Sequence, residues 1–447
     1  MGVNEELSLE SIPSLLEELR LLNNQDTELT NDILRIFAPL IEVKKMIDWS
    51  KATVESCLES LSFRKIPKVL ARDYKPSGSY PIIDQGQNLI AGWTDDDSVL
   101  ISTDLPIVIF GDHTRVFKYI DFPFVRGADG TQLLKPKAGI EPLFFYYACR
   151  AINIPSRGYN RHFKALKEKD IPIPPIGEQR NIARTLRRID DAILLQDKQL
   201  QVTTDMKRAA MQTLFTRGLK NEPQKETEIG PIPESWEVGQ LGQFADIIST
   251  RMQYTALEKM VNANEDGVRV LGIKVADMNL PGNEIELQTA TLERKLDRAT
   301  VEQRCAPPRT IIFPKRGAAI ATNKKRISTE WTAFDPNVIG VVAGNRLDQT
   351  FLFQWFQMFD LRTITEPGPT PQLNKKNLLP LVIPIPPTRD EQREIVSILD
   401  TIDLKIDLHR KKRAVLDDLF KALLHKLMTG EIRVADLNLS HDYADGA

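Results

Sequence analysis

Two segments of this chain concentrate basic side chains in the way that a phosphate-binding surface requires. Residues 309–329 contain six lysines and arginines and no acidic residue, and residues 150–169 contain six against the single acid Glu168. Positive side chains gathered on one surface neutralise nucleic-acid phosphates and release bound counterions. The whole chain has a formal net charge of −2, but residues 1–60 hold 12 acidic and 5 basic side chains, so charge is segregated along the sequence. This distribution makes DNA a candidate partner.

The side chains selected as DNA contacts come from these basic segments and from the residues that precede two proline-rich strands. Lysine, arginine and amide side chains supply many contacts to DNA phosphates and base edges, and for that reason these residue types are chosen. In the second half of the chain the selected residues are Lys315, Arg316, Lys324, Lys325, Arg326, Gln372, Asn374, Lys375 and Lys376. In the first half they are Arg157, Tyr159, Arg161, His162 and Lys164. The competing interpretation is a solvated loop rim without contact to DNA.

No set of residues in the sequence predicts catalysis. The chain lacks a P-loop for nucleotide phosphates and a glycine-rich cofactor loop after a strand. It also lacks the Asn/Asp-Pro-Pro-aromatic tetrapeptide that amino-methyltransferases use. Cys57, Cys149 and Cys305 form neither a disulfide framework nor a zinc-ligand set, so we expect buried free thiols. We therefore expect no catalytic residue, no metal and no cofactor in this chain.

The elements that must position the DNA contacts are revealed by an internal repeat. Residues 171–216 contain Ile-Pro-Ile-Pro-Pro, then Glu-Gln-Arg, then a helical pattern, and residues 383–429 contain the same series again. From Glu178 to Thr216, 15 of 39 positions are identical to those 213 residues further along, without a gap. A period this long is not that of a solenoid repeat. It predicts a duplicated module with internal pseudo-two-fold symmetry, which duplex DNA would match.

Each copy of the repeat continues into a long amphipathic helix. Apolar residues recur at alternating spacings of four and three residues, which is the seam pattern of a left-handed coiled coil. The seam residues are Ile182, Leu186, Ile189, Ile193 and Leu200 in the first helix and Ile395, Leu399, Ile402, Ile406, Leu416 and Phe420 in the second. Thr388 and Glu391 predict a capping box, with Gly177 at the equivalent place in the first copy, while Gly218 and Gly430 are placed to end the helices. We expect the two helices to pair as an antiparallel coiled coil.

The repeat predicts an α+β fold in which two mixed α/β domains are separated by the two long helices. The expected segments are an acidic helical N-terminal extension (1–48), a first domain (49–175), a first long helix (176–220), a second domain (230–387), a second long helix (388–432) and a flexible tail (433–447). Residues 230–235 are expected to form a turn-rich linker. Short β-branched runs predict strands at 79–83, 106–110, 310–313 and 338–342. Because no apolar run approaches a membrane span and no signal peptide is apparent, we expect no membrane contact and a cytoplasmic location.

The two repeated blocks resemble the conserved regions of specificity (S) subunits of type I restriction–modification systems. The resemblance extends to residues 231–236, 313–317, 323–326 and 335–337, and it covers roughly residues 49–432. Residues 80–86 and 110–115 look like motifs of that family's target-recognition domains, which adds His113 and Arg115 to the expected DNA contacts. The sequence departs from the family at its acidic N-terminal extension. That extension could cap the coiled coil, contact a methyltransferase subunit or pack against the first domain.

The resemblance implies a function for each part of the chain. Each domain would read one half of a split double-stranded DNA target, and the coiled coil would hold the two readers a fixed distance apart. Two modification (M) subunits would supply S-adenosylmethionine and adenine methylation, and two restriction (R) subunits would supply translocation and cleavage driven by ATP and Mg. A 39-residue helix spans roughly 58 Å at about 1.5 Å per residue, which exceeds one DNA turn of about 34–36 Å. The chain itself would be non-catalytic.

Two other functions remain open from the sequence. The chain could be the specificity subunit of a type II enzyme whose partner fuses nuclease and methyltransferase, and only the neighbouring genes would separate that assembly from type I. A coiled-coil interaction protein without a DNA role is the other alternative, but it does not predict the acid-free basic run at 309–329. No sequence pattern predicts the DNA target or the length of its spacer. Nor does any pattern distinguish residues that contact bases from residues that contact phosphates.

Overall fold

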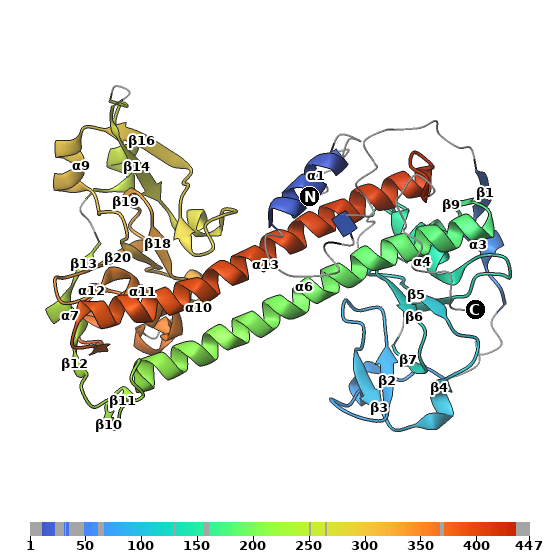
Figure 1. Ribbon diagram of the computed structural model, residues 1–447, viewed down its shortest axis with the longest axis horizontal. Coiled ribbons are helices and arrows are strands. Elements are labelled where there is room, and N and C mark those ends of the chain that lie inside the picture. Colours follow the sequence, from blue (N-terminus) through green and yellow to red (C-terminus); the bar gives the residue numbers. More distant parts are fainter. Residues whose placement is uncertain are drawn as a thin grey trace. The chain divides into compact units, whose positions relative to one another are not determined.

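The computed structural model describes most of the chain (Figure 1). The described residues are 11–22, 31, 33–34, 49–60, 67–128, 130–155, 161–249, 252–263, 266–366 and 371–434. The chain forms two compact units: unit 1 comprises residues 1–200 and 408–447, and unit 2 comprises residues 201–407. Each unit contains one mixed α/β domain and part of each long helix, as the α+β prediction requires.

The two long helices, α6 (Ile176–Arg217) and α13 (Arg389–Thr429), lie within the predicted ranges. Gly218 and Gly430 follow them with positive φ of 61° and 73°, so both act as the predicted C-terminal glycines. At the start of α13, Thr388 Oγ1 accepts the Glu391 N–H at 3.2 Å, which is one half of the predicted capping box. Gly177, by contrast, lies inside the first turn of α6, because this helix begins one residue earlier.

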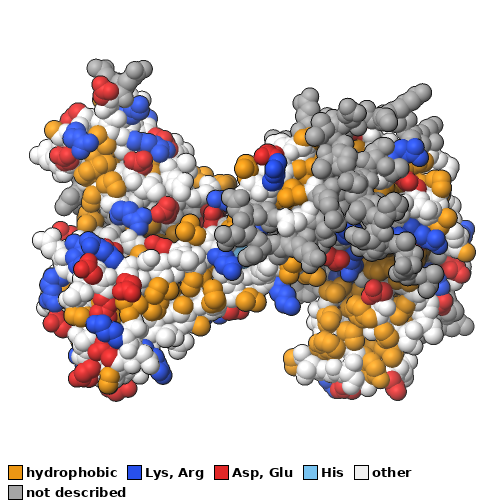
Figure 2. All heavy atoms as spheres, in the orientation of Figure 1, with side chains coloured by type: hydrophobic (Ala, Val, Ile, Leu, Met, Phe, Trp, Pro, Cys, Tyr) orange, Lys and Arg blue, Asp and Glu red, His pale blue; other side chains and the backbone are white. Residues whose placement is uncertain are grey.

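The α/β domain of unit 1 is built from short strands and short helices. Its elements are β1 (Ser50–Thr53), α3 (Val54–Cys57), β2 (Tyr80–Ile83), β3 (Gly92–Thr94), β4 (Leu100–Ile101), β5 (Ile107–Gly111), β6 (Phe117–Ile120), β7 (Phe124–Arg126), β8 (Thr131–Leu134), α4 (Pro142–Ala151), α5 (Phe163–Lys167) and β9 (Asp170–Ile173). The strands form sheets ordered β3-β2-β7-β4, β6-β5-β8 and β1-β9. The aromatic helix α4 is largely buried, which confirms that it packs in the core. Hydrophobic side chains also gather on the surface over the β3-β2-β7-β4 sheet (Figure 2).

Unit 2 contains more strands than unit 1 and, like unit 1, includes part of each long helix. They are β10 (Gln224–Thr227), β11 (Gly230–Pro233), β12 (Glu237–Gln240), α7 (Leu241–Phe244), β13 (Ala245–Ile248), α8 (Tyr254–Glu258), β14 (Val268–Ile273), β15 (Glu286–Leu287), β16 (Leu292–Leu296), α9 (Arg298–Arg304), β17 (Ile311–Pro314), α10 (Ala318–Ala321), β18 (Arg326–Ser328), β19 (Trp331–Phe334), β20 (Val338–Ala343), α11 (Gln349–Met358), α12 (Lys375–Leu378) and β21 (Val382–Ile385). The principal sheets are ordered β13-β20-β17-β18-β15 and β16-β14-β19. All four strands expected from β-branched runs are present, as β2, β5, β17 and β20.

The segment expected as a turn-rich linker at 230–235 instead contributes a strand to a β-hairpin. β10 pairs antiparallel with β11, with Thr227 opposite Gly230 across the turn. Gly230 adopts a positive φ of 94°, which suits a tight turn. The two prolines of β11 favour a turn on local grounds, but a two-stranded hairpin consists only of edge strands, where proline is tolerated.

The long helices pair antiparallel within each unit. In unit 1 the Val434 N–H donates to Glu178, and the side chain of Gln196 contacts His409 at 3.0 Å. The residue number of the partner falls as the residue number along α6 rises, which shows that the helices run antiparallel. In unit 2 Lys207 Nζ donates to both carboxylate oxygens of Asp403 at 2.7 Å. The seam residues are buried or partly buried: Ile182, Leu186, Ile189, Ile395, Leu399, Ile406, Leu416 and Phe420 are buried, and Ile193, Leu200 and Ile402 are partly exposed.

Helix α1 and the residues that follow α13 both contribute to the core of unit 1. In the N-terminal extension, α1 (Ser11–Leu22) buries Ile12 and Leu19 in the hydrophobic cluster that also contains the end of α13. Residue 434 does not belong to a flexible tail as predicted for 433–447, because Val434 is buried in the same cluster. The remainder of the tail, residues 435–447, lies outside the described residues. No helix among the described residues has the length and apolar character needed to cross a membrane.

Candidate nucleic-acid interface

In unit 2 the structure joins two sets of predicted DNA contacts that are more than fifty residues apart. The chain leaves β17 at Pro314, and the next residues form an irregular strand pair with residues 371–373. Leu373 N–H donates to Lys315 O at 2.9 Å, and Gly317 N–H donates to Pro371 O at 2.9 Å. Arg316 consequently lies directly opposite Gln372. We call Lys315, Arg316, Gln372, Asn374, Lys375 and Lys376 the second rim.

The short helix α12 presents the remaining side chains of the second rim. Asn374 caps this helix, and its N–H donates to the side chain of Asn377 at 2.8 Å. Lys375 and Lys376 follow on exposed positions. Lys376 Nζ lies 2.9 Å from Glu366 and lowers the pKa of that carboxyl group. The second rim therefore carries four basic side chains, one of which is paired with Glu366.

In unit 1 the turn after β5 is held against the start of α5 in the same way. Asp112 O accepts the His162 N–H at 2.9 Å, and its carboxylate accepts the N–H groups of His162 and Phe163 at 2.8 and 2.7 Å. This contact brings the turn that carries His113 and Arg115 next to the segment that carries Arg161 and Lys164. We call His113, Arg115, Arg161, His162 and Lys164 the first rim, of which Arg115, Arg161 and Lys164 are exposed.

Each rim is held by a backbone hydrogen bond at an equivalent place in its unit. In each unit the first residue after the central strand accepts a hydrogen bond, through its carbonyl group, from the residue at the entry to a short helix. The bond joins Asp112 O to His162 N in unit 1 and Lys315 O to Leu373 N in unit 2, both at 2.9 Å. The same connection therefore brings basic side chains together in both units.

Several predicted contact residues occupy other environments. Lys325 is 3% exposed, and its Nζ donates to Phe359 O at 2.6 Å, so this amine is not available to a DNA phosphate. His162 is 1% exposed, with its Nδ1 3.0 Å from Asp112 O, so its ring holds the rim together from inside. Lys324 contacts Asn279, and the Arg326 guanidinium donates to the carbonyl groups of Lys325 and Met278. Arg157 and Tyr159 lie outside the described residues.

The burial of Lys325 gives a prediction for stability against pH. Desolvation lowers the pKa of this amine to about 8. Between about pH 8 and 10.5 the unfolded chain therefore holds a proton that the folded chain has released, and stability rises with pH. We expect the contribution of Lys325 to the unfolding free energy to rise by up to about 3 kcal/mol across this window. Urea unfolding should show the wild type gaining up to this amount over Lys325→Met across the window, whereas the difference between the wild type and the exposed control Lys376→Met should stay constant; a constant difference for Lys325→Met as well would contradict the prediction.

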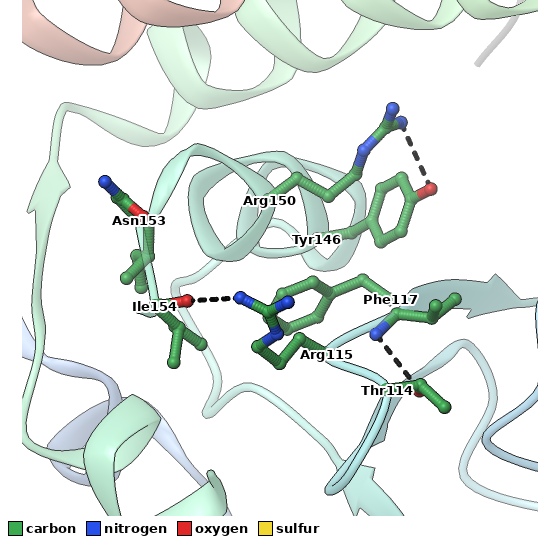
Figure 3. A pocket seen from close by; sticks show the side chains of 9 residues that line it. Thr114, Arg115, Phe117, Tyr146, Arg150, Asn153 and Ile154 are labelled. Atoms are coloured by element: carbon green, nitrogen blue, oxygen red, sulfur yellow. Dashed lines mark hydrogen bonds between the residues drawn. The ribbon is translucent and has the colours of Figure 1, made fainter. Parts of the chain in front are cut away.

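A pocket of about 530 Å³ lies beside the first rim (Figure 3). Arg115 lines it and donates through its guanidinium to Ile154 O at 2.8 Å. Arg150, also in the lining, donates to Tyr146 Oη at 3.2 Å and forms an ion pair with Asp190 at 2.8 Å. Arg150 belongs to the basic run at 150–169, but its guanidinium stacks over Phe420 at 4.5 Å. Its role is therefore to fasten α4 to the long helices.

The residues that orient each domain on its long helix were not selected from the sequence. Gln179 Oε1 accepts the Glu141 N–H at 2.9 Å and its Nε2 donates to Pro174 O at 2.8 Å. Gln392 makes the matching contacts, accepting the Asp348 N–H at 2.6 Å and donating to Pro386 O at 3.4 Å. Glu141 and Asp348 are the N-caps of α4 and α11. The repeated sequence Glu-Gln-Arg, which contains both glutamines, is the signal from which these attachment residues could have been found.

A second repeated position reinforces this attachment. Asp190 accepts hydrogen bonds from Tyr147 and Arg150, both at 2.8 Å. Asp403, its copy 213 residues later, accepts from Gln354 at 3.3 Å and from Lys207 at 2.7 Å. Both aspartates lie on the side of the helix that faces the α/β domain of their own unit. Among the described residues, no group of three or more His, Cys, Asp or Glu side chains could hold a metal ion.

Comparison with known proteins gives consistent similarities. The sequence matches the profile of the type I restriction modification DNA specificity domain over residues 46–204 and again over residues 233–418. Two relatives are from Methanocaldococcus jannaschii. The protein assigned to the type I restriction enzyme MjaX as its specificity subunit is 29% identical over 304 residues, which cover 65% of this chain and 65% of the relative. The MjaVIII specificity subunit is 28% identical over 287 residues, which cover 62% of this chain and 65% of the relative.

The chain thus spans slightly less than two thirds of the length of these relatives. Among solved structures, the crystal structure of a type I restriction–modification system S subunit from M. genitalium superposes with a TM-score of 0.54 at 16% identity. The superposition covers 87% of this chain and 98% of that chain. At this level of identity the likeness establishes the fold.

Proposed function

This chain belongs to the type I restriction–modification DNA specificity family, and we propose that it is the DNA-reading, non-catalytic subunit of such a complex. The observation that carries the proposal is the repeated construction of the two rims. In both units one backbone hydrogen bond of 2.9 Å joins the turn after the central strand to the entry of a short helix. Basic side chains from both partners are thereby placed together, as phosphate contacts require.

Each rim would approach one half of a bipartite target. In the second rim, Arg316, Lys375 and Lys376 would bind backbone phosphates, which fix the position of the domain without reading sequence. Gln372 and Asn374 carry the amide groups suited to hydrogen bonding with adenine edges. In the first rim, Arg115, Arg161 and Lys164 would take the corresponding phosphate-binding role, with His113 beside them.

The catalytic work would be done by partner subunits. Two M subunits would bring S-adenosylmethionine and methylate adenine, and two R subunits would bring ATP- and Mg-dependent translocation and cleavage. The complex would act on chromosomal and incoming DNA in the cytoplasm. The long helices, whose sequence is duplicated, would offer each M subunit a similar surface.

Methylome sequencing tests the proposal directly. A host without other adenine methylation would express this chain together with the M subunit encoded beside it. We expect one methylated motif made of two short half-sites separated by a fixed number of unspecified bases. A host expressing the M subunit alone serves as the control and should show no such motif. A continuous motif, or a motif independent of this chain, would contradict the proposal.

Exchange of one domain should change one half-site. We expect a chimaera in which residues 49–175 come from another family member to keep one half of the methylated motif and to acquire a new sequence in the other half. The physical reason is that each α/β domain has its own hydrophobic cluster and its own rim. The reciprocal exchange of residues 230–387 is the matched control. Loss or alteration of both half-sites in either chimaera would show that the domains do not read independently.

A further inference from the structure

Each unit contains a second sheet in addition to the one that leads to its rim, and these second sheets are built alike. The strands are ordered β3-β2-β7 in unit 1 and β16-β14-β19 in unit 2 (Figure 1). β2 and β14 each pair antiparallel with the first neighbour and parallel with the second. The segments that follow β2 and β14 are therefore equivalent. We call residues 84–88 the β2 loop and residues 274–279 the β14 loop.

In unit 1 a short turn connects the β2 loop to the first rim. The Gly127 N–H donates to the carbonyl group of Ile83, the last residue of β2, at 2.8 Å. Shortly after, Gly130 O accepts the Asp112 N–H at 2.7 Å. These bonds place the start of the β2 loop next to the turn that carries the first rim.

The same connection is present in unit 2. The Asp335 N–H donates to the carbonyl group of Ile273, the last residue of β14, at 3.0 Å. Shortly after, Asn337 O accepts the Lys315 N–H at 2.7 Å. The β14 loop thus begins beside the second rim, as the β2 loop begins beside the first.

A buried amine fixes the β2 loop. Lys118 on β6 is 4% exposed, and its Nζ donates to Asp84 O at 2.8 Å and to Asn88 O at 2.5 Å. The Asp84 carboxylate lies 3.8 Å from this amine and offsets part of the cost of burying a charge. Within the loop, Gln85 Oε1 accepts the His113 N–H of the first rim at 3.2 Å. One amine therefore holds both ends of a loop that contacts the rim.

Arg326 holds the β14 loop from the equivalent position of unit 2. Its guanidinium donates to Met278 O at 3.1 Å. Arg326 lies opposite Ile312 in the β17–β18 pair. Lys118 lies opposite Ile109 in the β5–β6 pair, and both isoleucines stand three residues before the carbonyl group that holds the rim. The two basic residues therefore occupy the same place in their domains.

The agreement between these side chains is not a consequence of the internal sequence repeat. Counting 213 residues from Lys118 leads to Trp331 and not to Arg326. Both basic side chains are drawn out of water, and desolvation lowers the pKa of each. Because removing a charge from water is costly, its occurrence at one place in two domains of different sequence indicates that both domains need this loop fixed.

We propose that Lys118 and Arg326 are positioning residues, each of which fixes a loop that reads bases of one half-site together with the rim beside it. The inference rests on the proposed function, since it requires two DNA-reading domains. Exposed amides in the loops suit hydrogen bonding to base edges: Gln87 and Asn88 in the β2 loop and Asn279 in the β14 loop. A loop that is already ordered spends no binding energy on becoming ordered.

This role predicts a specific defect when the buried amine is removed. In Lys118→Met, the correct half-site must order the β2 loop on binding, so its kcat/KM falls. A duplex with a wrong base pair makes fewer contacts to the loop and loses less. The mismatch penalty, which is the ratio of kcat/KM for the target to that for the mismatched duplex, therefore decreases. A variant that merely contains less folded protein loses activity on both duplexes equally and keeps the same ratio.

The test measures methyl transfer by the assembled methyltransferase on the target duplex and on duplexes that carry each single mismatch in turn. A mismatch ordinarily weakens binding by about fivefold or more. We expect Lys118→Met to decrease the penalty by at least about threefold at one or more positions of one half-site, and to leave the other half-site within about twofold of the wild type. Arg326→Met should do the reverse.

Lys135→Met is the matched control, because Lys135 is also an ion-paired lysine of unit 1, with its Nζ 2.6 Å from Asp104. It follows Leu134 at the end of β8, whereas the residue of β5 beside the first rim pairs with the start of β8. This variant should keep both penalties. Gln87→Ala/Asn88→Ala, which alters only exposed side chains of the β2 loop, should decrease the same penalty as Lys118→Met and tests the inference even if that variant folds poorly.

Two results overturn the inference while the proposed function stands. One is an unchanged mismatch penalty in the Gln87→Ala/Asn88→Ala variant or in folded Lys118→Met and Arg326→Met. The other is an equal decrease in both half-sites from a single one of these variants. A wild-type complex that shows no mismatch penalty in either half-site would instead refute the proposed function, and the inference with it.

Discussion

Reversing three charges of the second rim, with Arg316→Glu, Lys375→Glu and Lys376→Glu in one variant, is expected to weaken DNA binding at least about a hundredfold. These side chains are exposed, and the pairing of residues 315–317 with residues 371–373 holds them together. Each lost phosphate contact lowers the slope of log affinity against log salt by about 0.9, so the slope should fall by up to about 2.7. The measurement is a salt titration of binding to the methylated target by the assembled methyltransferase.

The control must carry the same charge change elsewhere in unit 2. Lys259→Glu, Arg298→Glu and Arg304→Glu alter exposed residues on or beside α8 and α9 and leave the rim intact. This variant should keep most of its affinity and its slope, apart from a small loss from net charge. If the two variants behave alike, the second rim is a solvated face and long-range charge alone explains the effect.

Sequence reasoning predicted some of the exposed basic residues correctly but not all of them. Arg316, Lys375 and Lys376 were selected because they are basic, and the structure leaves them exposed. Lys325 was selected on the same ground and is buried, because its amine reaches the carbonyl of Phe359, 34 residues away. A run of basic residues indicates the segment, but contacts from distant parts of the chain decide which of its members remain at the surface.

Local patterns were sufficient for the long helices. The alternating spacing of apolar residues specifies which side of each helix is buried, and the glycines at 218 and 430 supply the left-handed conformation that ends them. The hairpin at 224–233 was missed because two prolines in four residues conceal a strand pattern. Pairing with a neighbouring strand, which overrides that local signal, is visible only in the fold.

The rims could be predicted from the sequence only in part, unlike the long helices, which were predicted, and the hairpin, which was missed. Each rim depends on a hydrogen bond between residues 50 or 58 positions apart, a separation that periodicity does not encode. The duplicated sequence nevertheless indicated that equivalent positions in the two halves should do equivalent work. Comparison of Gln179 with Gln392, or of Asp190 with Asp403, would have identified the attachment residues, because identity across a duplication marks contacts that both copies need.

Lengthening both long helices by one heptad is expected to increase the distance between the two half-sites without changing either one. The contacts in unit 1 define where the insertions must go. Arg413 lies 3.2 Å from Asp197, and His409 contacts Gln196, so an insertion after Arg413 would separate pairs that face each other. Matched insertions belong after Leu200 in α6 and after Asp407 in α13. Seven residues preserve the alternation of four and three on both helices.

Seven residues add roughly 10 Å to each helix, and a base pair occupies about 3.4 Å of duplex, so the spacer should grow by up to about three base pairs. Methylome sequencing of a host that expresses the double-insertion variant with its M subunit would measure the change. Insertion in α6 alone is the informative control, because it leaves seven residues without seam partners and should lower the yield of folded protein. If the double-insertion complex assembles and still methylates the original spacing, the distance is set by the M subunits, and the paired helices serve only to join the two readers.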